Sequence, residues 1–149
     1  MRPHSADFAA GFVGLLGKPN LEGEVFHITT EEILTWDQIY GILAAAAGAS
    51  NPEIAHLPSQ TIHRLDPDLG TPLIGDLMYS SAYDNSKVRR VVPDYRAKIT
   101  WAEGVARSIA WYDADPARQV PDARLNARLD RLIELTRQLS GTPASSNST

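Results

Sequence analysis

The stretch Glu24-Val25-Phe26-His27-Ile28-Thr29, with the Thr35-Trp36-Asp37-Gln38 that follows it, decides the fold class of this chain. The first segment is a short run of apolar and β-branched residues behind a turn-prone segment, so it predicts a strand. The second has the pattern of a capping box, in which the threonine hydroxyl and the glutamine side chain accept hydrogen bonds from backbone amides of the first turn. A strand followed by a capped helix indicates an α/β or α+β domain.

Helices are predicted on both sides of this stretch. Ser5 or Asp7 would cap a first helix, and Gly17 with Pro19 would end it. The spacing of its large side chains places one apolar face on this helix, carried by Phe8, Phe12, Leu15 and Leu16. Further helices are expected from Thr35 to Gly48, from Ser59 to Leu65, from Asp84 to Val91, behind the capping box Thr100-Trp101-Ala102-Glu103, and over residues 122–140.

One more segment, Ile54-Ala55-His56-Leu57, is predicted to be a strand, which Pro58 ends. The stretch from Asp66 to Asp76 contains two prolines and two glycines and is expected to be mostly irregular. Two strands make a poor sheet, so we expect the two to be edge elements of a sheet whose centre lies outside this sequence.

The composition is that of a globular domain. Of the 149 residues, 43% are hydrophobic and 21% are charged, and the formal net charge is −4. The negative charge argues against a nucleic-acid partner, and the absence of cysteine excludes disulfides and thiolate chemistry. The longest apolar runs are too short for a membrane span, and the first seven residues do not resemble a secretory signal. We therefore expect a cytoplasmic protein with no membrane partner.

Two short patterns match catalytic motifs of short-chain dehydrogenases but lack the required context. Gly11-Phe12-Val13-Gly14-Leu15-Leu16-Gly17 matches G-x-x-G-x-x-G, yet a helical pattern precedes it and Lys18-Pro19 breaks the helix after it. A dinucleotide fingerprint needs a strand before the glycines and a helix behind them. We therefore interpret the run as a glycine-containing helix that packs closely on a neighbour.

The second pattern is Tyr83-Asp84-Asn85-Ser86-Lys87, which matches Y-x-x-x-K. The catalytic pair must share one helix face, whereas Asp84 is expected to cap the helix and would leave Tyr83 outside it. The segment from Gly11 to Tyr83 also holds too few βα units for a nucleotide-binding fold. We therefore assign no catalytic and no cofactor-binding residue to this chain, and a complete small short-chain dehydrogenase is disfavoured.

The order of the remaining features resembles the C-terminal part of an NAD(P)-dependent epimerase/dehydratase, a member of the extended short-chain dehydrogenase family. The resemblance covers residues 4 to about 116. It is carried by five segments in the family's order: His4-Ser5-Ala6-Asp7, Gly23-Glu24-Val25-Phe26-His27-Ile28, Thr35-Trp36-Asp37-Gln38-Ile39, Asp84-Asn85-Ser86-Lys87 with Pro93, and Thr100-Trp101-Ala102-Glu103-Gly104-Val105.

This resemblance implies a helix-rich α/β lobe of a Rossmann-type enzyme, with a few short strands and without the nucleotide-binding half. Intact relatives use bound NAD or NADP to oxidise or reduce a small molecule, often a nucleotide sugar. In the epimerases for nucleotide sugars, an arginine that grips the diphosphate commonly precedes the Gly-Asp before this segment. Here Pro72-Leu73-Ile74 precedes Gly75-Asp76, which favours a smaller or less charged substrate.

Three residues are candidates for contact with that substrate: Tyr79, Arg89 and Arg90. Tyr79 lies just beyond Gly75-Asp76, although packing on the lobe is the alternative interpretation. The two arginines would meet an anion, or form a solvated helix face. The four histidines lack the spacing of a zinc site, so no metal is expected.

We expect three parts: a substrate-side lobe over 1–118, an amphipathic helix over 119–141 and a disordered tail over 142–149. Two functions remain open. The chain is either a truncated epimerase/dehydratase that is inactive and binds no cofactor alone, or a non-enzymatic binding or subunit module derived from that lobe. The expected partners are a Rossmann half or a second copy of the chain, and a small-molecule substrate in the intact enzyme.

Overall fold

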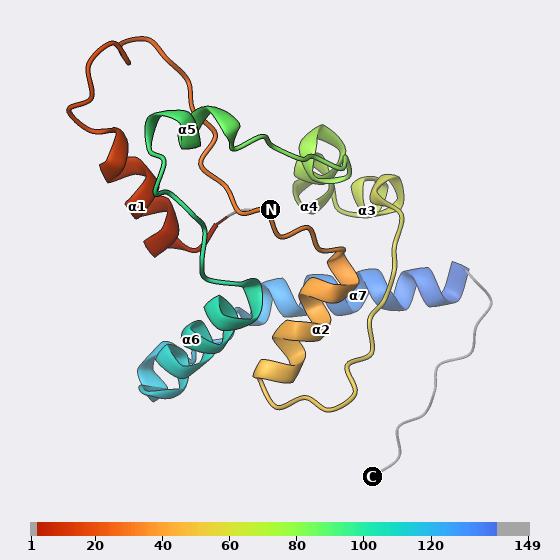
Figure 1. Ribbon diagram of the computed structural model, residues 1–149. Coiled ribbons are helices and arrows are strands. Elements are labelled where there is room, and N and C mark those ends of the chain that lie inside the picture. Colours follow the sequence, from red (N-terminus) through yellow and green to blue (C-terminus); the bar gives the residue numbers. More distant parts are fainter. Residues whose placement is uncertain (1–2, 140–149) are drawn as a thin grey trace. The chain divides into compact units, whose positions relative to one another are not determined.

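A computed structural model describes residues 3–139 (Figure 1). The described chain is built of helices. They are, in order, α1 Ser5–Leu15, α2 Trp36–Ala46, α3 Ser59–Leu65, α4 Pro67–Pro72, the π-helix η1 Leu73–Leu77, α5 Ser86–Val91, α6 Trp101–Asp113, the 3₁₀-helix η2 Pro116–Arg118, and α7 Ala123–Leu139. The helix-rich character expected of the lobe is therefore present.

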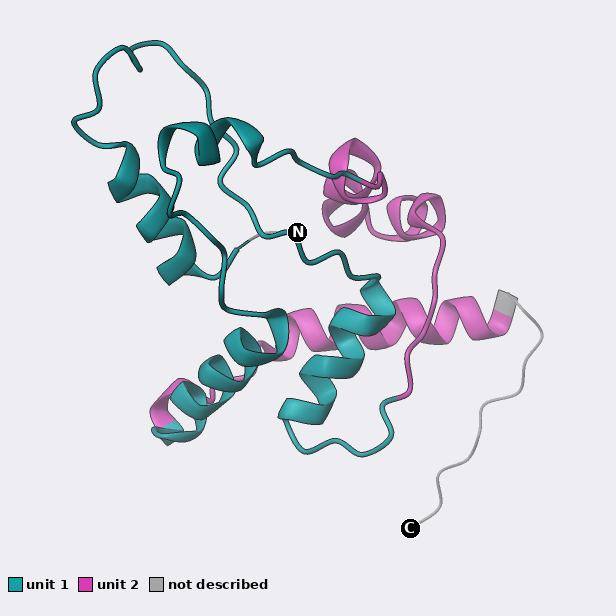
Figure 2. Cartoon of the chain, viewed as in Figure 1, with its two compact units in different colours: residues 1–52, 81–116 teal, residues 53–80, 117–149 magenta. Residues whose placement is uncertain are grey.

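The helices belong to two compact units (Figure 2). Residues 1–52 and 81–116 form unit 1, and residues 53–80 and 117–149 form unit 2. Unit 1 holds α1, α2, α5 and α6, with α2 packed on α6 and α1 on α5. Unit 2 holds α3, α4, η1 and α7.

The two predicted strands are wrong: within residues 3–139 the structure contains no β-strand. The segments Glu24–Thr29 and Ile54–Leu57 lack secondary structure. A strand exists only when a neighbouring strand supplies its ladder of hydrogen bonds, and the described residues supply none. In unit 1, side chains bind the segment around residues 24–30 instead, as described below.

The start of α1 also differs from the prediction. His4 is the N-cap, in place of Ser5 or Asp7. The Asp7 side chain is buried, and its carboxylate accepts hydrogen bonds from the backbone N–H groups of Lys98 (3.0 Å) and Ile99 (2.8 Å). A buried carboxylate requires such donors, and Asp7 finds them in another segment of unit 1 rather than at its own helix terminus.

The glycines of α1 form its packed face, as the interpretation of the glycine run predicts. A Cβ atom added to Gly11 would lie 2.8 Å from Ile28 Cγ2, and one added to Gly14 would lie 2.6 Å from Val92 Cγ1. Both distances are shorter than a carbon–carbon contact, so only glycine allows α1 to approach this closely. The close-packed helix interpretation is confirmed.

Both predicted capping boxes are present. The Thr35 side chain accepts from Gln38 N and the Gln38 side chain accepts from Thr35 N at the start of α2. Thr100 and Glu103 form the same reciprocal pair at the start of α6. These motifs are local in sequence, which is why the pattern alone identifies them.

Unit 2 contains order where irregular chain was expected. Residues 66–76 form α4 and most of η1, because Asp66 accepts from Leu69 N (3.2 Å) as an N-cap and Pro67 occupies the first helical position. Gly70 then lies against α3, where an added Cβ would be 2.2 Å from His63 Cα. Helix α7 matches the predicted helix over 122–140 within its described part. The tail over 142–149 lies outside the described residues.

Candidate functional site

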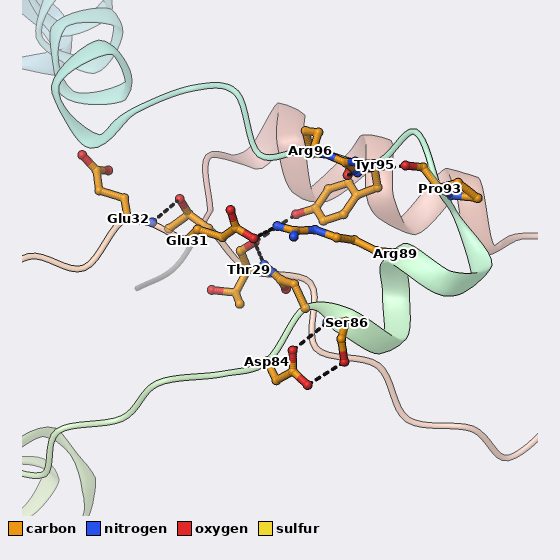
Figure 3. Close-up of polar contacts among 11 residues, drawn as sticks. Thr29, Glu31, Glu32, Asp84, Ser86, Arg89, Pro93, Tyr95 and Arg96 are labelled. Carbon is orange, nitrogen blue, oxygen red and sulfur yellow. Dashed lines mark hydrogen bonds and ion pairs between the residues drawn. The ribbon is translucent and has the colours of Figure 1, made fainter.

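The polar centre of unit 1 is a set of hydrogen bonds around Thr29 (Figure 3). Asn85 Oδ1 accepts from Thr29 N at 3.1 Å, and Asn85 Nδ2 donates to Thr29 O at 2.6 Å. The Tyr95 hydroxyl donates to the same carbonyl at 3.2 Å. All three residues are buried, so these bonds satisfy backbone groups that water does not reach. Sequence reasoning missed this set, because nothing local to Thr29 reveals a partner 56 residues away.

Arg89 belongs to the same region. Its guanidinium forms an ion pair with Glu31, whose side chain is 66% exposed, and its Nε is buried without a hydrogen-bond partner. Burial, together with the charge of Asp7, raises the pKa of the Tyr95 hydroxyl above its usual value near 10, and the positive charge of Arg89 opposes this shift. The group is a neutral phenol at physiological pH, and it binds backbone rather than a ligand.

The three candidate substrate contacts do not form one cluster within a unit. Arg89 and Arg90 are consecutive residues of α5 in unit 1, whereas Tyr79 follows η1 in unit 2. Arg90 is exposed and donates to Ser86 Oγ at 3.3 Å. Tyr79 is 64% exposed. Of the two arginines, Arg89 is the one that forms an ion pair with a carboxylate in unit 1, whereas Arg90 binds a serine hydroxyl.

The Tyr83 and Lys87 pair has the geometry expected of a chance match. Tyr83 lies before α5, which begins at Ser86, and its ring contacts His27 edge-on at 4.8 Å between centroids. Lys87 Nζ binds Glu24 Oε2 at 2.5 Å and Val25 O at 2.8 Å. This ion pair lowers the pKa of Glu24. The lysine therefore holds the extended segment onto α5.

The glycine run does not fit a dinucleotide. Helix α1 already includes Ser5–Ala10, so a helix and not a strand precedes the run. Gly11 and Gly14, which would have to admit a pyrophosphate, are in contact with Ile28, Tyr95 and Val92. A phosphate cradle needs free backbone N–H groups at a helix N-terminus, whereas these glycines lie inside a helix. The described residues thus offer NAD or NADP no glycine cradle in this run.

The described residues contain no group of three or more His, Asp or Glu side chains that would hold a metal ion. None of the helices in the described part of the chain is long and apolar enough to cross a membrane. The hollow in unit 2 has a volume of about 100 Å³ and is lined by Leu65, Asp66, Arg128, Arg131, Leu132 and Leu135. Ligand pockets for cofactors are several times larger, at roughly 300–1,000 Å³.

Asp66 and Arg128 form the wall of that hollow. Arg128 Nε and one of its terminal nitrogens donate to the two Asp66 oxygens at 2.8 and 2.5 Å. This bidentate pair lowers the pKa of Asp66 and raises that of Arg128. The guanidinium is therefore already occupied by a carboxylate of unit 2.

The outer face of α1 is the exposed apolar surface that is best suited to bind a partner. Asp7 is the single charged residue of α1, and it is buried. The exposed side chains include Phe8 (46%), Phe12 (49%) and Val13 (62%), with Leu16 (61%) just beyond the helix. The rings of Phe8 and Phe12 stack at 6.1 Å between centroids. A surface helix normally carries charge on its outer side, so this face has the composition of a covered one.

Next to α1, the segment around residues 24–30 presents free backbone. Lys87 holds Val25 O and Asn85 holds both backbone groups of Thr29, so the α5 side of the segment is occupied at its two ends. The backbone groups of Phe26 and Ile28 form none of the hydrogen bonds found among the described residues.

No protein-family model, no curated protein and no solved structure matches this chain. The resemblance to the epimerase/dehydratases therefore stands on the five sequence segments alone.

Proposed function

We propose that this chain is the substrate-side lobe of an NAD(P)-dependent epimerase/dehydratase and that it works with a nucleotide-binding half, on the same or another polypeptide. The lobe supplies contacts to a small hydroxyl or carbonyl substrate. The other half supplies the cofactor site and the catalytic residues. The origin of the lobe in a Rossmann-type enzyme is part of this proposal.

The observation that carries the proposal is that two neighbouring surfaces of unit 1 lack a partner. Helix α1 has an uncharged outer face, and the extended segment beside it, which touches α1 through Ile28 and Gly11, has free backbone groups at Phe26 and Ile28. A helix and an edge strand that complete a larger sheet have these two properties. A sheet partner would therefore cover both surfaces at once.

The motif residues support the same proposal by their roles within unit 1. Asp7 binds the chain at Lys98 and Ile99, and Asn85 and Lys87 bind the extended segment. These side chains hold the parts of the lobe together instead of lining a reaction centre. That role fits motifs that define the architecture of a substrate lobe.

Substrate contact remains assigned to Tyr79, Arg89 and Arg90. Within this set Arg90 is the strongest candidate for an anionic group of the substrate, because Arg89 is paired with Glu31. The absence of an arginine before Gly75-Asp76 favours a substrate smaller or less charged than a nucleotide sugar.

The deciding experiment adds a nucleotide-binding half in trans. The chain alone is expected to associate and to bind an apolar-surface dye, because α1 and the extended segment are uncovered. Addition of the nucleotide-binding half of an epimerase/dehydratase that carries the same motifs should abolish both signals in light scattering and dye fluorescence. A monodisperse chain that melts cooperatively and ignores the added half would overturn the proposal and favour a self-sufficient binding module.

Calorimetric titration gives a second test. The chain alone should show no heat of binding with NAD(H) or NADP(H), because its glycine run is packed inside unit 1. Micromolar affinity for either cofactor would instead support the complete-enzyme hypothesis.

A further inference from the structure

The N-cap of α1 is a histidine, which is an unusual cap because its acceptor nitrogen can be protonated. His4 precedes the helix with φ −60° and ψ 146°, and its Nδ1 accepts a hydrogen bond from Ala6 N at 3.1 Å. The carbonyl of the same residue accepts from Phe8 N at 2.9 Å. An imidazole nitrogen accepts a hydrogen bond only while it carries no proton, so this contact requires the neutral tautomer with hydrogen on Nε2.

Two acidic side chains on the segments that pack around His4, Asp7 and Glu103, already accept hydrogen bonds from backbone amides. The ring lies against α6, where a Cβ added to Gly104 would be 3.2 Å from His4 Cδ2. On its own helix, the Asp7 carboxylate already accepts from two backbone N–H groups. At the start of α6, the Glu103 carboxylate accepts from Thr100 N. The other charged residues on or beside α6 and α1 include Glu32, Lys98, Arg107 and Asp113. The Glu32 carboxylate accepts a hydrogen bond from Trp101 N.

Protonation of His4 would therefore act twice against α1. It would remove the acceptor of the Ala6 N–H, and it would place a positive charge at the helix terminus where the macrodipole is already positive. Histidine is the side chain that most often changes charge within the pH range that cells reach, which makes a histidine cap a contact to test with pH.

We propose that His4 is a pH-sensitive cap that holds the first turns of α1 together above neutral pH and releases them in mild acid. Because Phe8 and Phe12 lie in these turns, the cap controls how the outer face of α1 is presented. The effect of the cap on binding of the nucleotide-binding half rests on the function proposed above. The pH-sensitive cap itself does not depend on that function.

Hydrogen exchange on the chain alone tests the cap. The protection factors of the α1 amides from Phe8 to Gly11, corrected for intrinsic exchange, should fall about fivefold or more between pH 8 and pH 5.5, the size expected when an N-cap is lost. His4→Asn keeps a capping side chain that does not titrate and should hold its protection at both pH values. His27→Asn, a change at an exposed histidine of the same unit, should behave as wild type.

Equal protection of wild-type α1 at the two pH values would overturn the cap, and so would an equal fall in His4→Asn. Binding of the nucleotide-binding half at pH 8 and 5.5 then tests the docking clause separately. Weaker binding in acid that His4→Asn restores supports it, and pH-independent binding alongside a pH-dependent cap overturns it. If the nucleotide-binding half binds at neither pH, the proposed function is contradicted. The hydrogen-exchange result still shows whether His4 is a pH-sensitive cap.

Discussion

The side-chain amide of Asn85 binds both backbone groups of Thr29, donating to its carbonyl and accepting from its N–H. This is the pair of bonds that a residue in a neighbouring strand would make. A single side chain thus substitutes for a strand on the α5 side of the extended segment. It also links two parts of unit 1 that lie 56 residues apart.

Asn85→Ala should lower the free energy of unfolding by about 1–3 kcal/mol, because it leaves the buried N–H and carbonyl of Thr29 without this partner. Urea denaturation monitored by tryptophan fluorescence measures the change. Asn51→Ala, at an exposed asparagine of unit 1, is the matched control and should have no measurable effect. Similar losses in the two variants would contradict the role given to Asn85.

Gly11→Ala should destabilise unit 1 by about 1–3 kcal/mol, despite the higher helix propensity of alanine. The added Cβ would lie 2.8 Å from Ile28 and 2.9 Å from the Tyr95 ring, so α1 would have to move outward. Gly41→Ala in α2 is the control, since no atom lies within 4 Å of its Cβ position. That variant should be as stable as wild type or more stable by up to about 1 kcal/mol in the same denaturation experiment.

Alkaline pH should destabilise the chain through Tyr95. The pKa of this hydroxyl is raised in the folded state, so above about pH 10 the unfolded chain releases the proton more readily and is favoured. The contribution is complete below pH 10 and is lost as the pH rises through the folded-state pKa. Tyr95→Phe should flatten the decline of unfolding free energy between pH 9 and 11, whereas Tyr40→Phe, at a half-exposed ring, should leave it unchanged.

Gly70→Ala should disrupt unit 2, because a Cβ atom would lie 2.2 Å from His63 Cα and 2.5 Å from His63 N. Backbone atoms of α3 cannot move aside as a side-chain tip can, so we expect a loss of about 1–3 kcal/mol or more. Gly75→Ala adds the same atom in η1 where nothing lies within 4 Å, and it should be close to neutral. Equal thermal shifts for the two variants would exclude a contact between α4 and α3 at Gly70.

Tyr83→Phe should leave binding of the nucleotide-binding half and any reconstituted turnover almost unchanged, because Tyr83 precedes α5 and the Lys87 amine binds Glu24 and Val25. Lys87→Met is the informative partner, since it removes the bonds to Glu24 and Val25 and should weaken binding of the half. A fall in turnover of about a hundredfold in Tyr83→Phe would restore the catalytic interpretation of Y-x-x-x-K.

The features that could be predicted from the sequence are those encoded within a few residues. The two capping boxes, the C-terminal end of α1, the helix α7 within its described part and the packed glycines follow from local spacing and context. The strands could not be predicted correctly, because extended residues become a strand only beside another one. Glu24–Thr29 has the right residues and, within residues 3–139, no such neighbour.

Other differences arise from partners distant in the sequence. Asp7 is a reasonable N-cap by residue type, yet it binds the chain at residues 98 and 99. The α4–η1 region carries two prolines and two glycines, but its first proline starts a helix and Gly70 admits α3. The candidate arginines show the same limit, since the pairing of Arg89 with Glu31 has no sequence signature.

Asp66 forms hydrogen bonds with three helices of unit 2. Its N–H binds Ile62 O in α3, its carbonyl accepts from Gly70 N in α4, and its carboxylate binds Leu69 N and the Arg128 guanidinium of α7. Displacement of this one residue would break the bonds that end α3, begin α4 and attach α7 at the same time. Unit 2 should therefore open as a single cooperative block, with no stage at which α7 has left while α3 and α4 remain as they are.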